Sequence, residues 1–88
     1  MIRGIIFAHE GDLDRALENF ERSLRLRETS GNKFEIPQSL WYLARFSTQD
    51  GKIGRSFDLF KRSLAIAKES NNTFYIAVNL NSIGVTFI

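Results

Sequence analysis

The sequence predicts an all-α fold, a solenoid of antiparallel helix pairs with about five helices. The main observation is an internal repeat, because the 88-residue chain matches itself when it is shifted by forty positions. A second observation is that apolar residues recur at spacings of three and four, which is typical of one face of a helix. A third is that no segment alternates apolar and polar residues with a period of two, so no strand is expected.

The internal repeat runs through most of the chain. Identical residues recur forty positions apart: Gly11 and Gly51, Arg15 and Arg55, Phe20 and Phe60, Ser23 and Ser63, Leu24 and Leu64, Asn32 and Asn72, Phe34 and Phe74, Leu40 and Leu80. Self-similarity at such a period is typical of stacked helical repeats. We therefore expect one domain over 1–88, with a first repeat at 1–33, a second at 34–73 and the first helix of a third at 74–88.

The apolar spacing and the turn residues predict the helix boundaries. The expected helices are 1–10, 12–30, 34–49, 52–70 and 73–88. Gly11 and Gly51 each favour a tight turn after a helix. Asn32 and Glu35 have the spacing of a capping box, and Pro37 fits a first helical turn, where a missing N–H costs least.

The charged residues predict solvated helix faces. Twelve basic and ten acidic side chains give a net charge of +2, which argues against nucleic acid as a partner. Three acid-first pairs four residues apart predict ion pairs within a helix: Glu18–Arg22, Glu21–Arg25 and Asp58–Arg62. Glutamates also alternate with the arginines of the second expected helix, which disfavours a phosphate site: Arg15, Arg22, Arg25 and Arg27.

No residue pattern indicates catalysis. The chain has no cysteine, and His9 is the only histidine, so neither a metal site nor a catalytic triad is expected. We expect His9 at the end of a helix, close to a turn. The sequence therefore predicts a protein that is not an enzyme and has no cofactor.

The first residues do not form a targeting or membrane segment. The apolar stretch that follows Arg3 is too short for a signal peptide, and Glu10 and Asp12 follow it at once. No run of residues approaches the length of a membrane span. We expect a cytoplasmic protein that does not bind membranes.

The repeated positions resemble tetratricopeptide repeats, whose pattern is W-x2-L-G-x2-Y in a first helix and A-x3-F in a second. The second repeat reads Leu40-x2-Leu43-Ala44-x2-Ser47 and then Ser56-x3-Phe60. The first keeps Gly4-x2-Phe7 and Ala16-x3-Phe20, and the third opens with Leu80-x2-Ile83-Gly84-x2-Phe87. The sequence departs from the pattern in three ways. Ser47 replaces an aromatic residue and Arg3 an apolar one, and the usual proline after the second helix is absent, since Glu28 and Lys68 stand there. The longer period resembles the repeats of kinesin light chain and of peptide-sensing bacterial regulators. The resemblance implies a right-handed solenoid.

The resemblance also implies a peptide-binding groove lined by the first helix of each repeat. In the second and third repeats, the equivalent residues are Gln38, Trp41, Arg45, Thr48 or Gln49, Val78, Asn81, Val85 and Ile88. In the first repeat they are Met1, Ile5, Ala8 and His9. Trp41 and Arg45 lie four residues apart and have the chemistry of an interface hot spot. The alternative is that Trp41 packs on a neighbouring helix.

One subclass of the family grips a C-terminal carboxylate with lysine and asparagine side chains. The matching positions here hold other residues: Met1, Ile5, Tyr42, Val78 and Ser82. A clamp of this kind is therefore not expected.

The last expected helix has no charged residue from 71 to 88. A helix that is apolar around most of its circumference is normally buried on all sides. We therefore expect a homo-oligomer, with an interface that includes Ile76, Ile83, Val85, Phe87 and Ile88.

These observations favour a scaffold for protein–protein interaction that binds a peptide or a helix. One alternative is a self-assembly module that oligomerises through its apolar terminal helices. A second alternative is the sensor segment of a tetratricopeptide-containing regulator.

Overall fold

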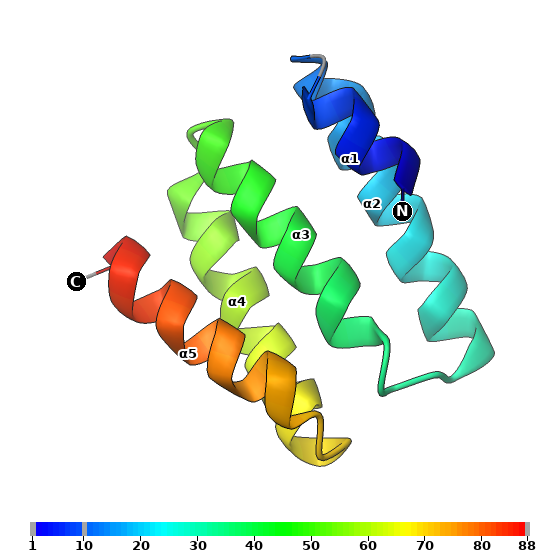
Figure 1. The fold of residues 1–88 in the computed structure, drawn as a ribbon, viewed down its shortest axis with the longest axis vertical. Coiled ribbons are helices and arrows are strands. Elements are labelled where there is room, and N and C mark those ends of the chain that lie inside the picture. The colour runs from blue at the N-terminus through cyan, green and yellow to red at the C-terminus, as the bar shows by residue number, and fades with distance from the viewer. Residues whose placement is uncertain (1, 10, 88) are drawn as a thin grey trace.

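The computed structural model describes residues 2–9 and 11–87, together with the side chains of 3–6 and 11–86. Within these ranges helices are joined by short turns and there is no strand, as expected (Figure 1). The helices are α1 (Ile2–His9), α2 (Leu13–Ser30), α3 (Ile36–Gln49), α4 (Ile53–Glu69) and α5 (Thr73–Phe87). The five expected segments are thus confirmed, with boundaries that differ by one or two residues.

Glycine closes three of the turns between helices. Gly11, Gly31 and Gly51 have φ angles of 79°, 73° and 80°, in the left-handed region that other residues rarely adopt. The expected turns after the first and third helices are confirmed. Asp12 then begins α2, because its Oδ1 accepts a hydrogen bond from the Arg15 N–H at 3.2 Å.

The expected capping box of Asn32 and Glu35 is wrong. Helix α3 begins at Ile36, so the capping position belongs to Glu35, whose side chain makes no capping hydrogen bond. The Asn32 carbonyl instead accepts the Glu35 N–H at 3.2 Å, in a turn that precedes the helix. The equivalent residue Asn72 does stand at the start of α5, where its Oδ1 accepts the Tyr75 N–H. Pro37 lies in the first turn of α3, as expected.

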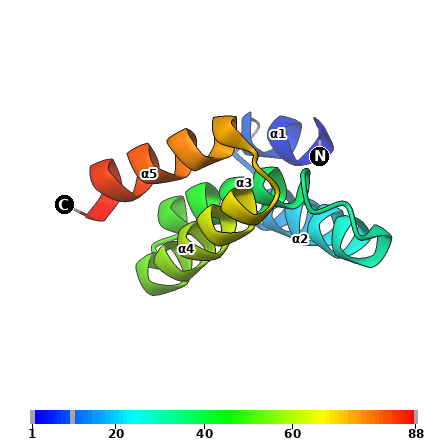
Figure 2. The same ribbon diagram turned by 90° about the horizontal axis from the view of Figure 1, so that it is seen from below.

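Each helix packs against its neighbours along the chain. Helix α3 is central, since it packs against α2, α4 and also α5. In Figure 2, α2 and α4 form one side of the molecule, α1 and α5 lie on the other, and α3 lies between them. This arrangement leaves α3 flanked by α1 and α5.

The core lies mainly between α2 and α3. Phe20 is fully buried, and the rings of Tyr42 and Phe46 stack with it at centroid distances of 5.0 and 5.4 Å. Gly4 lets α1 approach the same ring, because a Cβ at this position would lie 2.9 Å from Phe20. The equivalent residue Phe60 is also buried.

The repeat in the sequence is also a repeat of contacts. The hydroxyls of Ser23 and Ser39 lie 3.1 Å apart, and forty residues later Asn79 Nδ2 donates to Ser63 Oγ at 2.8 Å. The Ser63 hydroxyl in turn donates to the Pro37 carbonyl at 2.9 Å. The contact between α2 and α3 therefore recurs, in the same register, between α4 and α5.

Two ion pairs join α2 to α4. Arg55 pairs with Glu21, and Arg62 pairs with Glu28 at 2.6 Å. The two glutamates are seven residues apart, as are the two arginines, so the pairs follow one edge of each helix.

The ion pairs expected within single helices are absent from the described residues: Glu18–Arg22, Glu21–Arg25 and Asp58–Arg62. Glu21 and Arg62 instead reach the neighbouring helix. Spacing along one helix predicts only pairs within that helix. It does not show which residues of another helix lie within reach.

Candidate functional site

A cavity of about 330 Å³ opens between α3 and α5 and reaches α4. Its lining residues come from all three helices: Trp41, Arg45, Thr48, Phe60, Asn81, Ser82, Val85 and Thr86. Five of the predicted groove residues therefore line one cavity: Trp41, Arg45, Thr48, Asn81 and Val85. Their role in binding stays a prediction.

The cavity lies where the third repeat has smaller side chains than the second. Tyr42 and Phe46 of α3 stack on Phe20. Forty residues later the same positions of α5 hold Ser82 and Thr86, and both residues line the cavity beside Phe60. The exchange of two aromatic rings for two small hydroxyl side chains accounts for the open space. The sequence motifs do not predict this cavity, but the loss of aromatic rings between positions 42 and 82 and between positions 46 and 86 indicates it.

Trp41 connects α3 to α5. Its indole Nε1 donates a hydrogen bond to Ser82 Oγ at 2.9 Å. Its ring also makes edge contacts with Tyr42 and Tyr75, at centroid distances of 5.0 and 6.5 Å. Trp41 thus packs on a neighbouring helix, which was the alternative to a role in the groove. Its ring is half-buried and also lines the cavity.

Arg45 supplies the positive charge of the cavity. Its guanidinium lies 5.5 Å from the centre of the Trp41 ring, a cation–π arrangement. Arg45 is exposed and forms no ion pair with any described carboxylate. Helix α5 contributes only uncharged groups, the Asn81 amide and two hydroxyls. The cavity therefore combines aromatic walls, one unpaired cation and several hydrogen-bonding groups.

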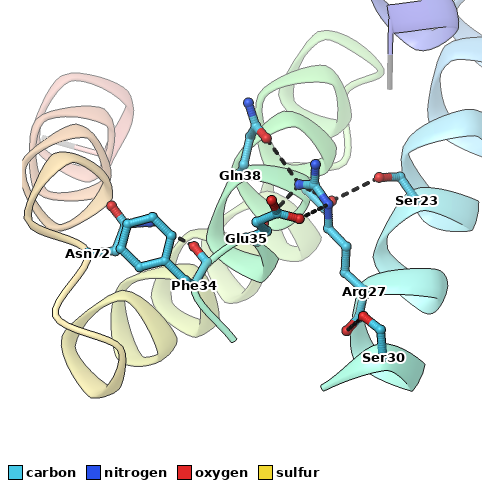
Figure 3. Close-up of polar contacts among 8 residues, drawn as sticks. Ser23, Arg27, Ser30, Phe34, Glu35, Gln38 and Asn72 are labelled. Atoms are coloured by element: carbon cyan, nitrogen blue, oxygen red, sulfur yellow. Dashed lines mark hydrogen bonds and ion pairs between the residues drawn. The ribbon is translucent and has the colours of Figure 1, made fainter. Parts of the chain in front are cut away.

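Three predicted groove residues lie outside this cavity. Gln49 is exposed, Val78 is half-buried, and Gln38 takes part in a separate polar cluster. Arg27 Nη1 donates to Gln38 Oε1 at 3.1 Å and to the Glu35 carbonyl at 2.8 Å (Figure 3). The cluster anchors the start of α3 to α2, so Gln38 has a structural role.

Tyr75 borders the same polar cluster. Burial raises the pKa of the Tyr75 phenol above its ordinary value, and the nearby Tyr42 phenol raises it further. A hydrogen bond from Gln38 and the charge of Arg27 act in the opposite direction. The phenol is therefore neutral at physiological pH and offers a hydrogen-bonding group but no charge.

Of the groove residues predicted in the first repeat, Ile5 is the one whose side chain the structure describes. Ile5 packs against the hydrophobic core. Met1 lies outside the described residues, as do the side chains of Ala8 and His9.

The described part of the chain contains no cluster of residues that could hold a metal ion. None of its helices is long and apolar enough to cross a membrane.

The predicted oligomer interface is only partly described. Val85 is 77% exposed, whereas Ile76 and Ile83 are half-buried. The side chain of Phe87 and the whole of Ile88 lie outside the description.

Comparison with protein-family models, curated proteins and solved structures finds no match to this chain.

Proposed function

We propose that this chain is a protein-interaction module that binds a peptide segment on the face formed by α1, α3 and α5. We further propose that its helix pairs stack as in a tetratricopeptide solenoid. The repeated hydrogen bond between Ser23 and Ser39 and between Ser63 and Asn79 supports this stacking. The observation that carries the proposal is the cavity between α3 and α5.

The cavity favours an aromatic side chain of the peptide. Its volume lies near the lower end of the ~300–1,000 Å³ typical of ligand pockets, which is enough for one large side chain. In the second repeat two rings stand at the equivalent positions, and in this cavity Trp41 and Phe60 offer aromatic surfaces to an incoming ring. Arg45 can pair with a carboxylate of the same peptide.

Trp41 is the only tryptophan of the chain, so its fluorescence reports directly on the cavity. We expect peptides selected from a displayed random library to be enriched in aromatic residues and to shift the Trp41 emission on binding. Thr86→Phe should place a ring at the position that Phe46 holds in the second repeat, fill the cavity and abolish binding. Thr29→Phe adds the same ring at an exposed position of α2, outside the cavity and the proposed binding face, and should leave binding unchanged. Tight binding by the Thr86→Phe protein would contradict the proposal.

The alternative function is self-assembly through α5. It is supported by two large apolar side chains of this helix, since Leu80 is 53% and Val85 77% exposed. A two-fold dimer that joins α5 to α5 would bury both residues. The expected homo-oligomer stays a prediction.

A further inference from the structure

We infer that the open face of α5, with the adjoining edge of α4, binds an amphipathic helix of another polypeptide that carries two carboxylates seven residues apart. This surface differs from the cavity and is independent of the proposed peptide site. Three features of the described residues support the inference: an apolar face, an ion-pair pattern inside the chain, and the charges at its edge.

The apolar face of α5 is in register with a buried face of α3. Leu40, Leu43 and Ala44 are at most 1% exposed where α3 packs against α2 and α4. The equivalent residues of α5 are Leu80, Ile83 and Gly84. Leu80 is 53% exposed, and no atom lies within 4 Å of a Cβ placed on Gly84. A helix that packs on α5 as α4 packs on α3 would cover this face.

The ion pairs between α2 and α4 show how the edges of such helices are matched. Glu21 and Glu28 of α2 face Arg55 and Arg62 of α4, and the spacing is seven residues on both sides. The helix contacts repeat every forty residues. Positions 61 and 68 of α4 are therefore equivalent to Glu21 and Glu28 of α2, and they lie on the edge of α4 that a further helix would meet.

Those two positions hold Lys61 and Lys68 in place of the glutamates. Both lysines are exposed, and neither forms an ion pair with a described carboxylate. Helix α5 has no charged residue that could compensate them. A helix that docks in register therefore needs carboxylates where α4 carries Arg55 and Arg62.

The same charges disfavour a second copy that continues the stack head to tail. Its α2 would present Arg15, which pairs with Asp12 at 3.3 Å, and Arg22 at the positions equivalent to Arg55 and Arg62. Two arginines would then face Lys61 and Lys68, and like charges in contact oppose association. The two lysines at this edge of α4 therefore favour an acidic helix over a second copy of the same chain.

Two synthetic peptides test this selection. One has the α4 sequence Ile53–Glu69 with Arg55→Glu and Arg62→Glu, and the control has the unchanged α4 sequence. Fluorescence anisotropy with labelled peptides should show about tenfold tighter binding of the acidic peptide at low ionic strength, because each exposed pair contributes modestly. The preference should shrink at high salt, as expected for screened charges.

Variants of the protein complete the test. Lys61→Glu with Lys68→Glu should reverse the preference of the two peptides, and Leu80→Glu should weaken both. Thr86→Phe should retain the acidic peptide, so failure at the peptide cavity is distinguishable from failure here. Equal binding of the two peptides, or no binding of either, would overturn the inference. A micromolar dimer that the acidic peptide does not dissociate would overturn it too, by assigning the face to a second copy.

Discussion

Gly4 and Gly84 occupy equivalent positions in the repeat but have different surroundings. A Cβ on Gly4 would lie 2.9 Å from the Phe20 ring, which is fully buried and stacked on Tyr42 and Phe46. The ring therefore has little room to move away. Gly84 meets no atom within 4 Å, so the glycine there only reduces the stability of α5.

The two glycines should respond to alanine in opposite directions. Gly4→Ala should lower the free energy of unfolding by about 1–3 kcal/mol through overpacking. Gly84→Ala should raise it by about 0.5–1 kcal/mol, because alanine favours the helix. Urea denaturation of both variants and the parent measures the difference. A stabilised Gly4→Ala protein would show that α1 does not approach Phe20 as described.

At the scale of the elements, α2 and α4 are equivalent helices with different N-termini. The Asp12 side chain accepts the Arg15 N–H, whereas Lys52 at the same position of α4 makes no capping hydrogen bond. Lysine has no acceptor to offer to the unpaired N–H groups of a first turn. The first turn of α4 therefore lacks the stabilisation that Asp12 gives to the first turn of α2.

Removing the cap of α2 and adding one to α4 should change the free energy of unfolding by similar amounts, with opposite signs. Asp12→Ala should lower the free energy of unfolding by about 1 kcal/mol. Lys52→Asn should raise it by up to about 1 kcal/mol, since asparagine supplies the acceptor and places no second carboxylate beside Asp50. Thermal melts followed by circular dichroism test both variants. If Lys52→Asn melts below the parent, the pair of Lys52 with Asp50 outweighs the cap.

At the scale of the whole molecule, buried apolar surface is unevenly distributed. Among the described side chains, every buried hydrophobic residue belongs to α2, α3 or α4. The buried residue of α5 is Asn79, which bonds Ser63 and the Tyr75 carbonyl but leaves its Oδ1 without a partner. Helix α5 is thus held by few apolar contacts and one incompletely paired amide.

This distribution predicts a gradient of local stability. Amide hydrogens of α5 should exchange faster than those of α2 and α3 in native-state hydrogen exchange, because α5 can open without exposing the core. The acidic peptide should slow exchange in α5, whereas the unchanged α4 peptide should have a smaller effect. Protection that is equal in α3 and α5 would contradict the gradient.

The local pattern of the sequence determined the helices and their repeat. Spacings of three and four, the turn glycines and Pro37 act within a few residues of each other, so the chain itself specifies where helices form. The self-match also paired Phe20 with Phe60, and the structure shows that both are buried. Five cavity residues followed from the family resemblance and not from spacing: Trp41, Arg45, Thr48, Asn81 and Val85.

Only the tertiary structure decided which long side chains meet. Glu21 pairs with Arg55 thirty-four residues away instead of Arg25 on its own helix, because the edges of α2 and α4 lie within reach of each other. Asn32 does not cap α3, because Arg27 holds the Glu35 carbonyl and sets the start of that helix. The cavity likewise depends on which positions of α5 lie over α4, and a pattern along one helix does not contain that information.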